Sequence, residues 1–168
     1  MNTSDAILLG QFDGTEGVAA FRAIQPLAGA NHLVFASFGV LFSPLVARLP
    51  VQGGHDVTAV EDGERALAAL AGGEFRVLIC DWEMPGLSGP DLCRRIRRMD
   101  TGYVYVIMLT SRSGTSSIIE ALSAGADEFL SKPVEPTELL ARIHTGMRLI
   151  SMETREMALF ALARLAES

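Results

Sequence analysis

The feature that most constrains the fold is a regular alternation of short apolar runs and amphipathic segments through the middle of the chain. Two of the runs, 77–81 and 103–109, are apolar almost throughout instead of alternating with polar residues. Continuous apolar runs of this length are typical of parallel strands that are buried on both faces. When helical segments separate such strands, the chain forms a parallel sheet with right-handed crossovers. We therefore predict an α/β fold, a doubly wound five-stranded parallel sheet with helices on both faces.

The segments between the strands carry helix start and stop signals. We predict helices over 63–70, 88–99 and 115–124, a short strand over 128–131, and a final helix that opens at Pro136. Proline is favoured at the first position of a helix, and a glycine pair after residue 71 would stop the first helix.

The final helix is predicted to extend well past the sheet. Apolar residues recur at helical steps of three, four and seven, at Leu140, Ile143, Met147, Ile150, Met157, Ala161 and Leu165. An apolar stripe that is left open to water usually finds a partner. Residues 147–168 are therefore predicted to form a helical linker. We hypothesise parallel dimerisation through a short coiled coil there, although Thr154 interrupts the stripe.

Polar side chains stand at the ends of three predicted strands. Asp81 ends one buried run, Thr110 and Ser111 follow the next, and Lys132 follows 128–131. Taken singly, each has a plain structural explanation, because Asp and Thr cap turns and a lysine reaches solvent. Open parallel sheets bind ligands at the carboxyl ends of their strands. An acid, a hydroxyl and an ammonium on successive strand ends therefore indicate a site.

Short motifs occur in a fixed order around these strand ends. They are Gly54–Val57, Glu61–Leu67, Asp81–Gly89, Leu109–Ser111, Ala124–Phe129 and Lys132-Pro133. As an ordered set they resemble the CheY-like receiver domain of two-component response regulators. The resemblance implies a flavodoxin-like fold, a receiver domain over residues 32–146 and an atypical N-terminal extension over residues 1–31.

The resemblance implies a chemical role for each strand-end residue. Asp81 would accept a phosphoryl group from a histidine kinase or a phosphotransfer protein, by nucleophilic attack of its carboxylate. Lys132 would neutralise the phosphoryl group, which Met84 and Ser111 would also contact. No enzymatic activity is expected beyond self-phosphorylation and dephosphorylation at Asp81.

The same resemblance implies a conformational switch made by Thr110 and Phe129. Thr110 would move toward the bound phosphoryl group and Phe129 would follow, which relays the signal to an output domain or partner. Phe129 stands where the family often has tyrosine. A switch that depends on a phenolic hydroxyl is therefore not available to this chain.

The resemblance also implies a magnesium ion, which the family holds with an acidic pair at the end of the first strand and with the phosphoacceptor. Placing that strand at 33–38 puts Ser37 and Phe38 where the pair is expected, and an alternative strand at 40–42 offers no acid either. The ligands that remain are Asp81 and the backbone carbonyl of Glu83, unless the Glu83 side chain or an acid of the N-terminal extension contributes. We predict weak magnesium binding and impaired phosphorylation.

Composition narrows the range of partners. The chain has 168 residues, a net charge of -6 and a pI near 5.0, which argues against nucleic-acid binding.

Cys80 and Cys93 lack redox or zinc-site spacing and are expected to be reduced packing residues. The uncharged stretch 23–47 is interrupted by prolines and polar residues, so membrane insertion is not expected and the chain is expected in the cytoplasm. A solvated helix face is expected for the basic cluster Arg94, Arg95, Arg97 and Arg98.

The last segment, Glu153–Ser168, resembles the linker that leads into the output domain of response regulators with an HD-GYP-type phosphodiesterase. Two functions remain open. The chain is a phosphoacceptor receiver, or it is a degenerate pseudo-receiver that serves as an interaction and dimerisation module without phosphorylation. The strand-end residues favour the first function, and Ser37 and Phe38 favour the second.

Overall fold

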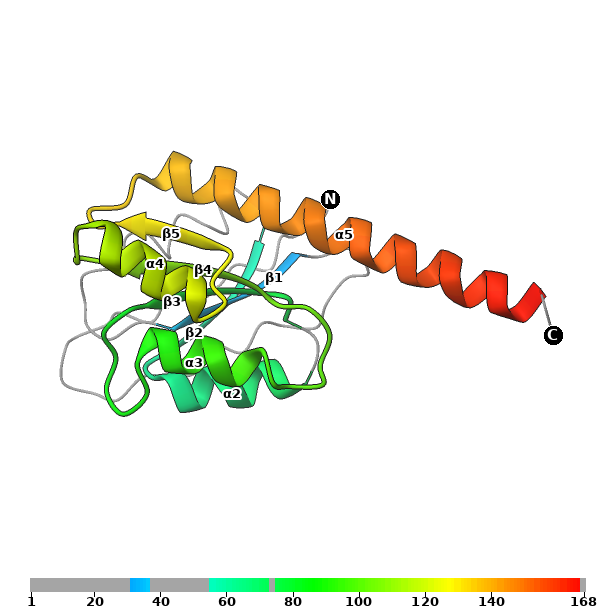
Figure 1. The fold of residues 1–168 in the computed structure, drawn as a ribbon, viewed down its shortest axis with the longest axis horizontal. Helices are drawn as coiled ribbons and strands as arrows, with labels where there is room; N and C mark the ends of the chain where they lie inside the picture. Colours follow the sequence, from blue (N-terminus) through cyan, green and yellow to red (C-terminus); the bar gives the residue numbers. More distant parts are fainter. Residues whose placement is uncertain (1–30, 37–54, 73–74, 167–168) are drawn as a thin grey trace, which may run out of the picture.

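The computed structural model describes residues 31–36, 55–72 and 75–166, and these residues contain one parallel sheet (Figure 1). Its strand order is β2-β1-β3-β4-β5, and every pairing is parallel. The order reverses between β1 and β3, as in other doubly wound sheets. The predicted fold class is confirmed. The strands are β1 Asn31–Ala36, β2 His55–Val60, β3 Val77–Asp81, β4 Tyr105–Thr110 and β5 Glu128–Ser131.

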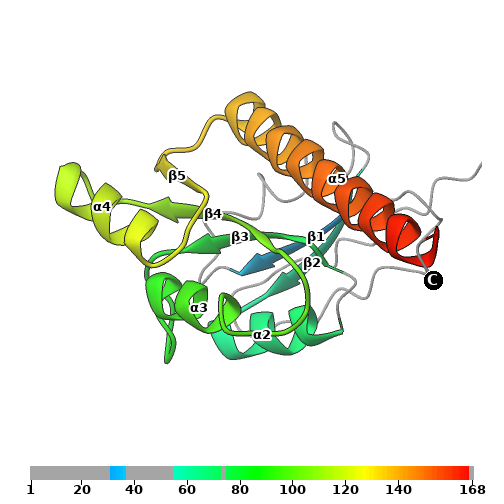
Figure 2. The same cartoon turned by 45° about the vertical axis from the view of Figure 1, so that its right-hand side comes forward.

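Helices cover both faces of the sheet. One face carries α2, α3 and α4, and α5 packs on the other (Figures 1 and 2). Asp62 and Ser88 cap α2 and α3 by accepting hydrogen bonds from backbone amides of the first turn, which are otherwise unsatisfied. The helices are α2 Gly63–Ala71, α3 Gly89–Ile96, α4 Thr115–Ser123 and α5 Pro136–Ala166.

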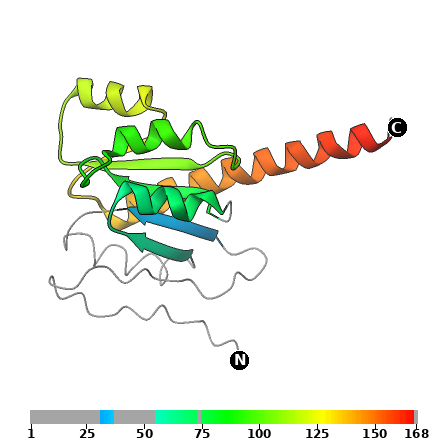
Figure 3. The ribbon, with the colours of Figure 1, turned by 90° about the horizontal axis from the view of Figure 1, so that it is seen from below.

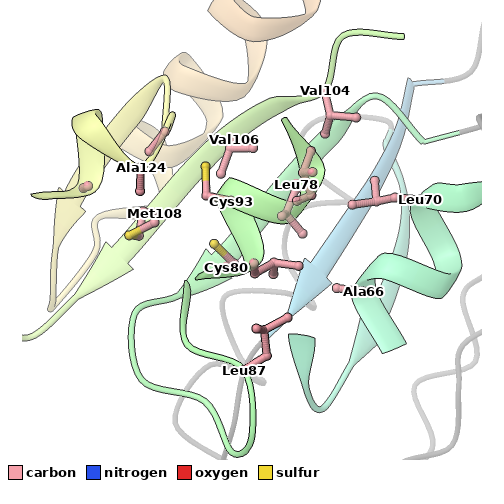
Figure 4. Close-up of a cluster of buried hydrophobic side chains, with 14 of the residues drawn as sticks. Ala66, Leu70, Leu78, Cys80, Leu87, Cys93, Val104, Val106, Met108 and Ala124 are labelled. Carbon is pink, nitrogen blue, oxygen red and sulfur yellow. The ribbon is translucent and has the colours of Figure 1, made fainter. Parts of the chain in front are cut away.

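The larger hydrophobic core lies between the sheet and the helices α2, α3 and α4. Leu78 and Cys80 of β3, and Val106 and Met108 of β4, are fully buried there. Figure 4 shows these side chains between the strands and the helices, next to Leu70 of α2. Because side chains alternate along a strand, the residues between them point to the opposite face, toward α5.

The long helix α5 packs on the sheet with its first half. Leu139 and Ile143 are fully buried against Ile79 and Ile107 of the central strands. The remainder of the helix extends away from the sheet (Figure 3). The apolar stripe predicted from the sequence is therefore divided, because its first half covers the core and its second half is open to water. The large exposed side chains beyond residue 155 are Met157, Leu159, Phe160, Leu162 and Leu165.

The predicted end of the helix over 88–99 was wrong, and so was the prediction for one arginine of the basic cluster. The helix predicted over 88–99 ends at Ile96. Arg97, expected on a solvated face, is half-buried and donates hydrogen bonds to the carbonyls of Val104 and Gly125. It also forms a 2.8 Å ion pair with Asp127. These contacts tie the end of α3 to the strand and turn beyond it.

The second central strand begins later than predicted. The apolar run suggested a strand from Tyr103, whereas β4 starts at Tyr105. Gly102 has a φ of 79°, which is a turn conformation that favours glycine. The carbonyl of Tyr103 accepts a 2.6 Å hydrogen bond from Arg76, so it is bonded to a side chain and not to a neighbouring strand.

In the part of the chain that the structure describes, no helix is long and apolar enough to cross a membrane. Most of the uncharged stretch 23–47, the N-terminal extension before Asn31, and the positions of Ser37 and Phe38 lie outside the described residues.

Candidate functional site

The structure brings the three predicted strand-end residues to one edge of the sheet. Asp81 is the last residue of β3, Thr110 is the last residue of β4, and Lys132 follows β5. These strands are neighbours, with Asp81 paired to Leu109 and Thr110 paired to Ser131. The Lys132 Nζ atom lies 2.6 Å from Asp81 Oδ1. We call these three side chains the strand-end site.

The strand-end site contains a buried charge. Asp81 is 2% exposed and Thr110 is 1% exposed, whereas 22% of the Lys132 side chain remains accessible. Burying a carboxylate costs several kcal/mol unless a counter-charge is close. Lys132 supplies that counter-charge, so an acid is maintained in a position where an apolar residue would pack at lower cost.

The loop between β3 and α3 fixes the backbone at Asp81. The Trp82 amide donates to the carbonyl of Leu109 at 2.8 Å, and the Gly89 amide donates to the carbonyl of Trp82 at 2.8 Å. An ideal Cβ at Gly89 would lie 2.5 Å from the Asp81 carbonyl oxygen. Gly86 has a φ of 75°, which favours glycine at the loop tip. The two glycines let the loop close tightly over the end of β3.

Arg112 is a site residue that the sequence analysis missed. Its backbone amide donates a 2.9 Å hydrogen bond to Thr110 Oγ1. Its guanidinium lies 3.3 Å from Glu83 Oε1 and 5.2 Å from the centroid of the Trp82 ring. The side chain therefore crosses from the loop after β4 to the loop after β3. The signal available in the sequence was a cation two residues after a strand end.

The remaining predicted residues lie near the strand-end site in different environments. Met84 is half-buried against the larger core, and Ser111 is exposed directly after Thr110. Phe129 is half-buried against the same core and pairs with Met108 across β4 and β5. Thr110 and Phe129 thus stand on neighbouring strands, as a coupled switch requires. Their roles remain predictions.

The donors for a magnesium ion are few. Among the described residues, no group of three or more His, Cys, Asp or Glu side chains is placed to hold a metal. Asp81 is paired with Lys132, and the Glu83 side chain is paired with Arg112. The sequence contains no Asp or Glu between Glu16 and Asp56. Because magnesium requires oxygen ligands in near-octahedral geometry, these residues do not fit the ion as the family holds it.

β1 overlaps the first of the two strand positions predicted from the sequence but begins two residues earlier, at Asn31. β1 ends at Ala36, which pairs with Cys80, the residue before Asp81. The chain continues from Ala36 into Ser37 and Phe38, neither of which has a carboxylate. The alternative strand at 40–42 lies outside the described residues.

The two cysteines take no part in the strand-end site. Both are buried and free. Burial raises the pKa of the Cys80 thiol far above its usual value and raises the pKa of Cys93 to about 11. Both therefore stay protonated at neutral pH and serve as packing residues in the larger core, as the sequence predicts.

An open parallel sheet with a buried acid, a hydroxyl and an ammonium on adjacent strand ends defines a doubly wound α/β domain with a charged site at the carboxyl edge of its sheet. Residues 42–144 match the family model described as response regulator receiver domain. The chain therefore belongs to the response regulator receiver family.

Known proteins of this family resemble the chain over most of its length. The transcriptional regulatory protein TcrA of Mycobacterium tuberculosis is 39% identical over 127 residues, which cover 76% of this chain and 49% of TcrA. The chain thus spans about half the length of that relative. The receiver domain of Francisella response regulator 1452 superposes with a TM-score of 0.65 at 27% identity, covering 70% of this chain and 97% of that one.

A further solved structure shares the fold of this chain. The receiver domain of the sensor histidine kinase PA1611 from Pseudomonas aeruginosa contains a magnesium ion coordinated in its active-site cleft. Its TM-score is 0.63 at 23% identity, over 73% of this chain and 99% of that one. At that identity the likeness concerns the fold.

Proposed function

We propose that this chain is a phosphoacceptor receiver whose nucleophile is Asp81. The observation that carries the proposal is the buried ion pair between Asp81 and Lys132, 2.6 Å long, beside Thr110 at the carboxyl edge of the sheet. The phosphoryl donor is a histidine kinase or a phosphotransfer protein. Beyond phosphorylation and dephosphorylation at Asp81, the chain has no enzymatic activity of its own.

The proposed reaction is an in-line displacement at phosphorus. A carboxylate oxygen of Asp81 forms a bond to the phosphorus atom while the bond from phosphorus to the donor breaks, and the donor leaves with that electron pair. The transition state is loose and spreads charge over three oxygens, so the protein acts by positioning and neutralisation. Lys132 supplies positive charge, the Thr110 hydroxyl supplies a hydrogen bond, and Met84 and Ser111 contact the phosphoryl oxygens.

The signal leaves the site through neighbouring strands. Thr110 moves toward the phosphoryl group, which frees space that Phe129 then occupies on β5. That rearrangement alters the surface formed by α4, β5 and α5, which an output domain or a partner protein recognises. Since Phe129 has no hydroxyl, the change is transmitted by packing alone.

A pseudo-receiver is the second candidate function. The observation that favours it is the absence of any Asp or Glu between residues 17 and 55, which removes the acidic pair with which the family holds magnesium. In that case the chain serves as an interaction and dimerisation module, and Asp81 with Lys132 is a structural ion pair.

The partners follow from the charge and from the long helix. The net charge of -6 disfavours nucleic-acid binding by this chain itself, whereas TcrA is by name a transcriptional regulator.

In the proposed domain organisation, residues 32–146 form the receiver and residues 147–168 form the linker. The linker leads to an output of the HD-GYP type. A homodimer forms through the distal part of α5. The chain acts in the cytoplasm.

Fluorescence of Trp82 tests the proposed function. Trp82 is the chain's single tryptophan, is 4% exposed and follows Asp81 directly. Adding beryllofluoride, a phosphoryl mimic, to the phosphoacceptor receiver should change its emission, and Asp81→Asn and Lys132→Ala should abolish the change. An unchanged emission in the wild-type chain, or the same response in Asp81→Asn, would favour the pseudo-receiver. Restoring acids with Ser37→Asp and Phe38→Asp should make the response to beryllofluoride depend on magnesium.

A further inference from the structure

Arg112 places a second cation between the two loops that follow Asp81 and Thr110. Its side chain spans the two loops that follow β3 and β4, and two contacts hold its guanidinium there. The guanidinium forms a 3.3 Å ion pair with Glu83, and its central carbon lies 5.2 Å from the centroid of the Trp82 ring. Its backbone amide is bonded to the Thr110 hydroxyl. Trp82 directly follows Asp81, Glu83 is two residues after it, and Thr110 belongs to the strand-end site.

A phosphoryl group at Asp81 poses a charge problem. The group carries a charge of about -1.5 to -2 near neutral pH. Lys132 contributes a single positive charge. The sequence between residues 17 and 55 contains no acid to hold a divalent cation, and the described residues include no cluster suited to one. The remaining negative charge needs another counter-charge close to the site.

We propose that Arg112 supplies this charge, so that phosphorylation of Asp81 proceeds without a divalent cation. This inference rests on the proposed phosphoacceptor function. Arg112 exchanges Glu83 for the phosphoryl oxygens, where its planar fork makes two parallel hydrogen bonds. The exchange costs little, because the Arg112 and Glu83 side chains are 50% and 76% exposed and such surface pairs contribute at most about 1 kcal/mol.

The proposed step balances with acetyl phosphate as the donor. An Asp81 carboxylate oxygen bonds to phosphorus, the bond from phosphorus to the acetate oxygen breaks, and acetate leaves as the anion. Arg112 and Lys132 both keep their protons. Glu83 acts as a competitor in this scheme, since it holds the guanidinium away from the phosphoryl group until the anion arrives.

The test measures the rate at which the full chain gains one phosphoryl group from acetyl phosphate, by intact mass, in excess EDTA and in magnesium chloride. Wild-type rates should agree within about twofold between the two conditions. In EDTA, Arg112→Ala should lower the rate roughly tenfold, which corresponds to the loss of one hydrogen-bonded charge. Glu83→Gln should raise it severalfold, because the competitor is removed.

Arg95→Ala is the matched control. Arg95 makes a 2.7 Å ion pair with Glu64 between α3 and α2, and its side chain is 52% exposed, close to the value for Arg112. The control should leave the rate unchanged. Trp82 emission on addition of beryllofluoride gives a readout that is independent of turnover, and Arg112→Ala should raise its half-saturation concentration while Arg95→Ala should not.

The outcomes separate this inference from the proposed function. If Asp81 is phosphorylated only with magnesium, or if Arg112→Ala behaves like Arg95→Ala, the inference is overturned and the phosphoacceptor function stands. If the wild-type chain gains no phosphoryl group in either condition, both fail. Opposite effects of Arg112→Ala and Glu83→Gln on the rate in EDTA support the inference.

Discussion

Gly89 offers the sharpest test of how the fold positions Asp81. It is the first residue of α3, and an ideal Cβ there would lie 2.5 Å from the Asp81 carbonyl oxygen and 3.1 Å from the Trp82 Cα atom. Both of these are backbone atoms, so no flexible side chain can move aside. The substitution Gly89→Ala must therefore shift either the start of α3 or the end of β3.

Two opposing effects determine how much Gly89→Ala changes the free energy of unfolding. Forcing a methyl group into a packed site typically costs about 1–3 kcal/mol, and replacing glycine by alanine in a helix returns roughly 0.5–1 kcal/mol. A net loss of about 1–2 kcal/mol should lower the melting temperature by roughly 2–8 °C. Thermal unfolding followed by circular dichroism measures it, and the phosphorylation rate of the same variant should fall because the Asp81 backbone moves.

Gly72→Ala is the control for Gly89→Ala. A Cβ added at Gly72 would have the Ala69 carbonyl oxygen as its nearest neighbour, at 3.8 Å. The φ of Gly72, -69°, suits any residue. It should be neutral or stabilising by about 0.4–1 kcal/mol. If Gly89→Ala proves as stable as Gly72→Ala and reacts at the wild-type rate, the tight contact between α3 and the end of β3 is refuted.

Two further predictions concern the helix α5 and the effect of pH. Phe160, 71% exposed on α5, is buried in the proposed dimer, so Phe160→Ser should remove at least about 1.5 kcal/mol per copy and weaken dimerisation tenfold or more. Light scattering over a range of concentrations measures this, and a wild-type chain that stays monomeric would contradict it. Burial, then the Glu128 carboxylate, raises the pKa of Tyr105 from 10.0 to about 12. The unfolded chain therefore loses that proton first, and the free energy of unfolding should fall as the pH rises from about 10 to about 12. In Tyr105→Phe, the urea concentration at the unfolding midpoint should depend less on pH over this range. The same pH dependence in the variant and the wild-type chain would contradict the assignment.

The sequence was sufficient to place the carboxyl ends of β3, β4 and β5 and the polar residues there, although β4 begins two residues later than predicted. Buried parallel strands are marked by continuous apolar runs, and the carboxyl ends of neighbouring parallel strands meet at one edge of the sheet. For that reason Asp81, Thr110 and Lys132 could be placed together although they are far apart in the chain. The course of α5 was also predictable, because its helical pattern continues from Pro136 with no proline after it.

The arginines could not be placed from the sequence, because their partners come from distant loops. Arg97 lies in a run that reads as a solvated helix face, yet it donates hydrogen bonds to the carbonyls of Val104, just before β4, and Gly125, in the turn after α4. Arg112 has no helical or strand periodicity around it, and its partner Glu83 belongs to another loop. Long side chains at loop positions reach whichever group the fold brings near, and a local pattern does not encode that choice.

Locating the phosphoryl group shows directly whether Asp81 is the phosphoacceptor. The chain is incubated with acetyl phosphate, digested, and its peptides are mapped by mass spectrometry. We expect one added phosphoryl group, on the peptide that contains Asp81, and none on the corresponding peptide of Asp81→Asn. A phosphoryl group found elsewhere in the chain, or an unmodified Asp81 peptide after prolonged incubation, would contradict it.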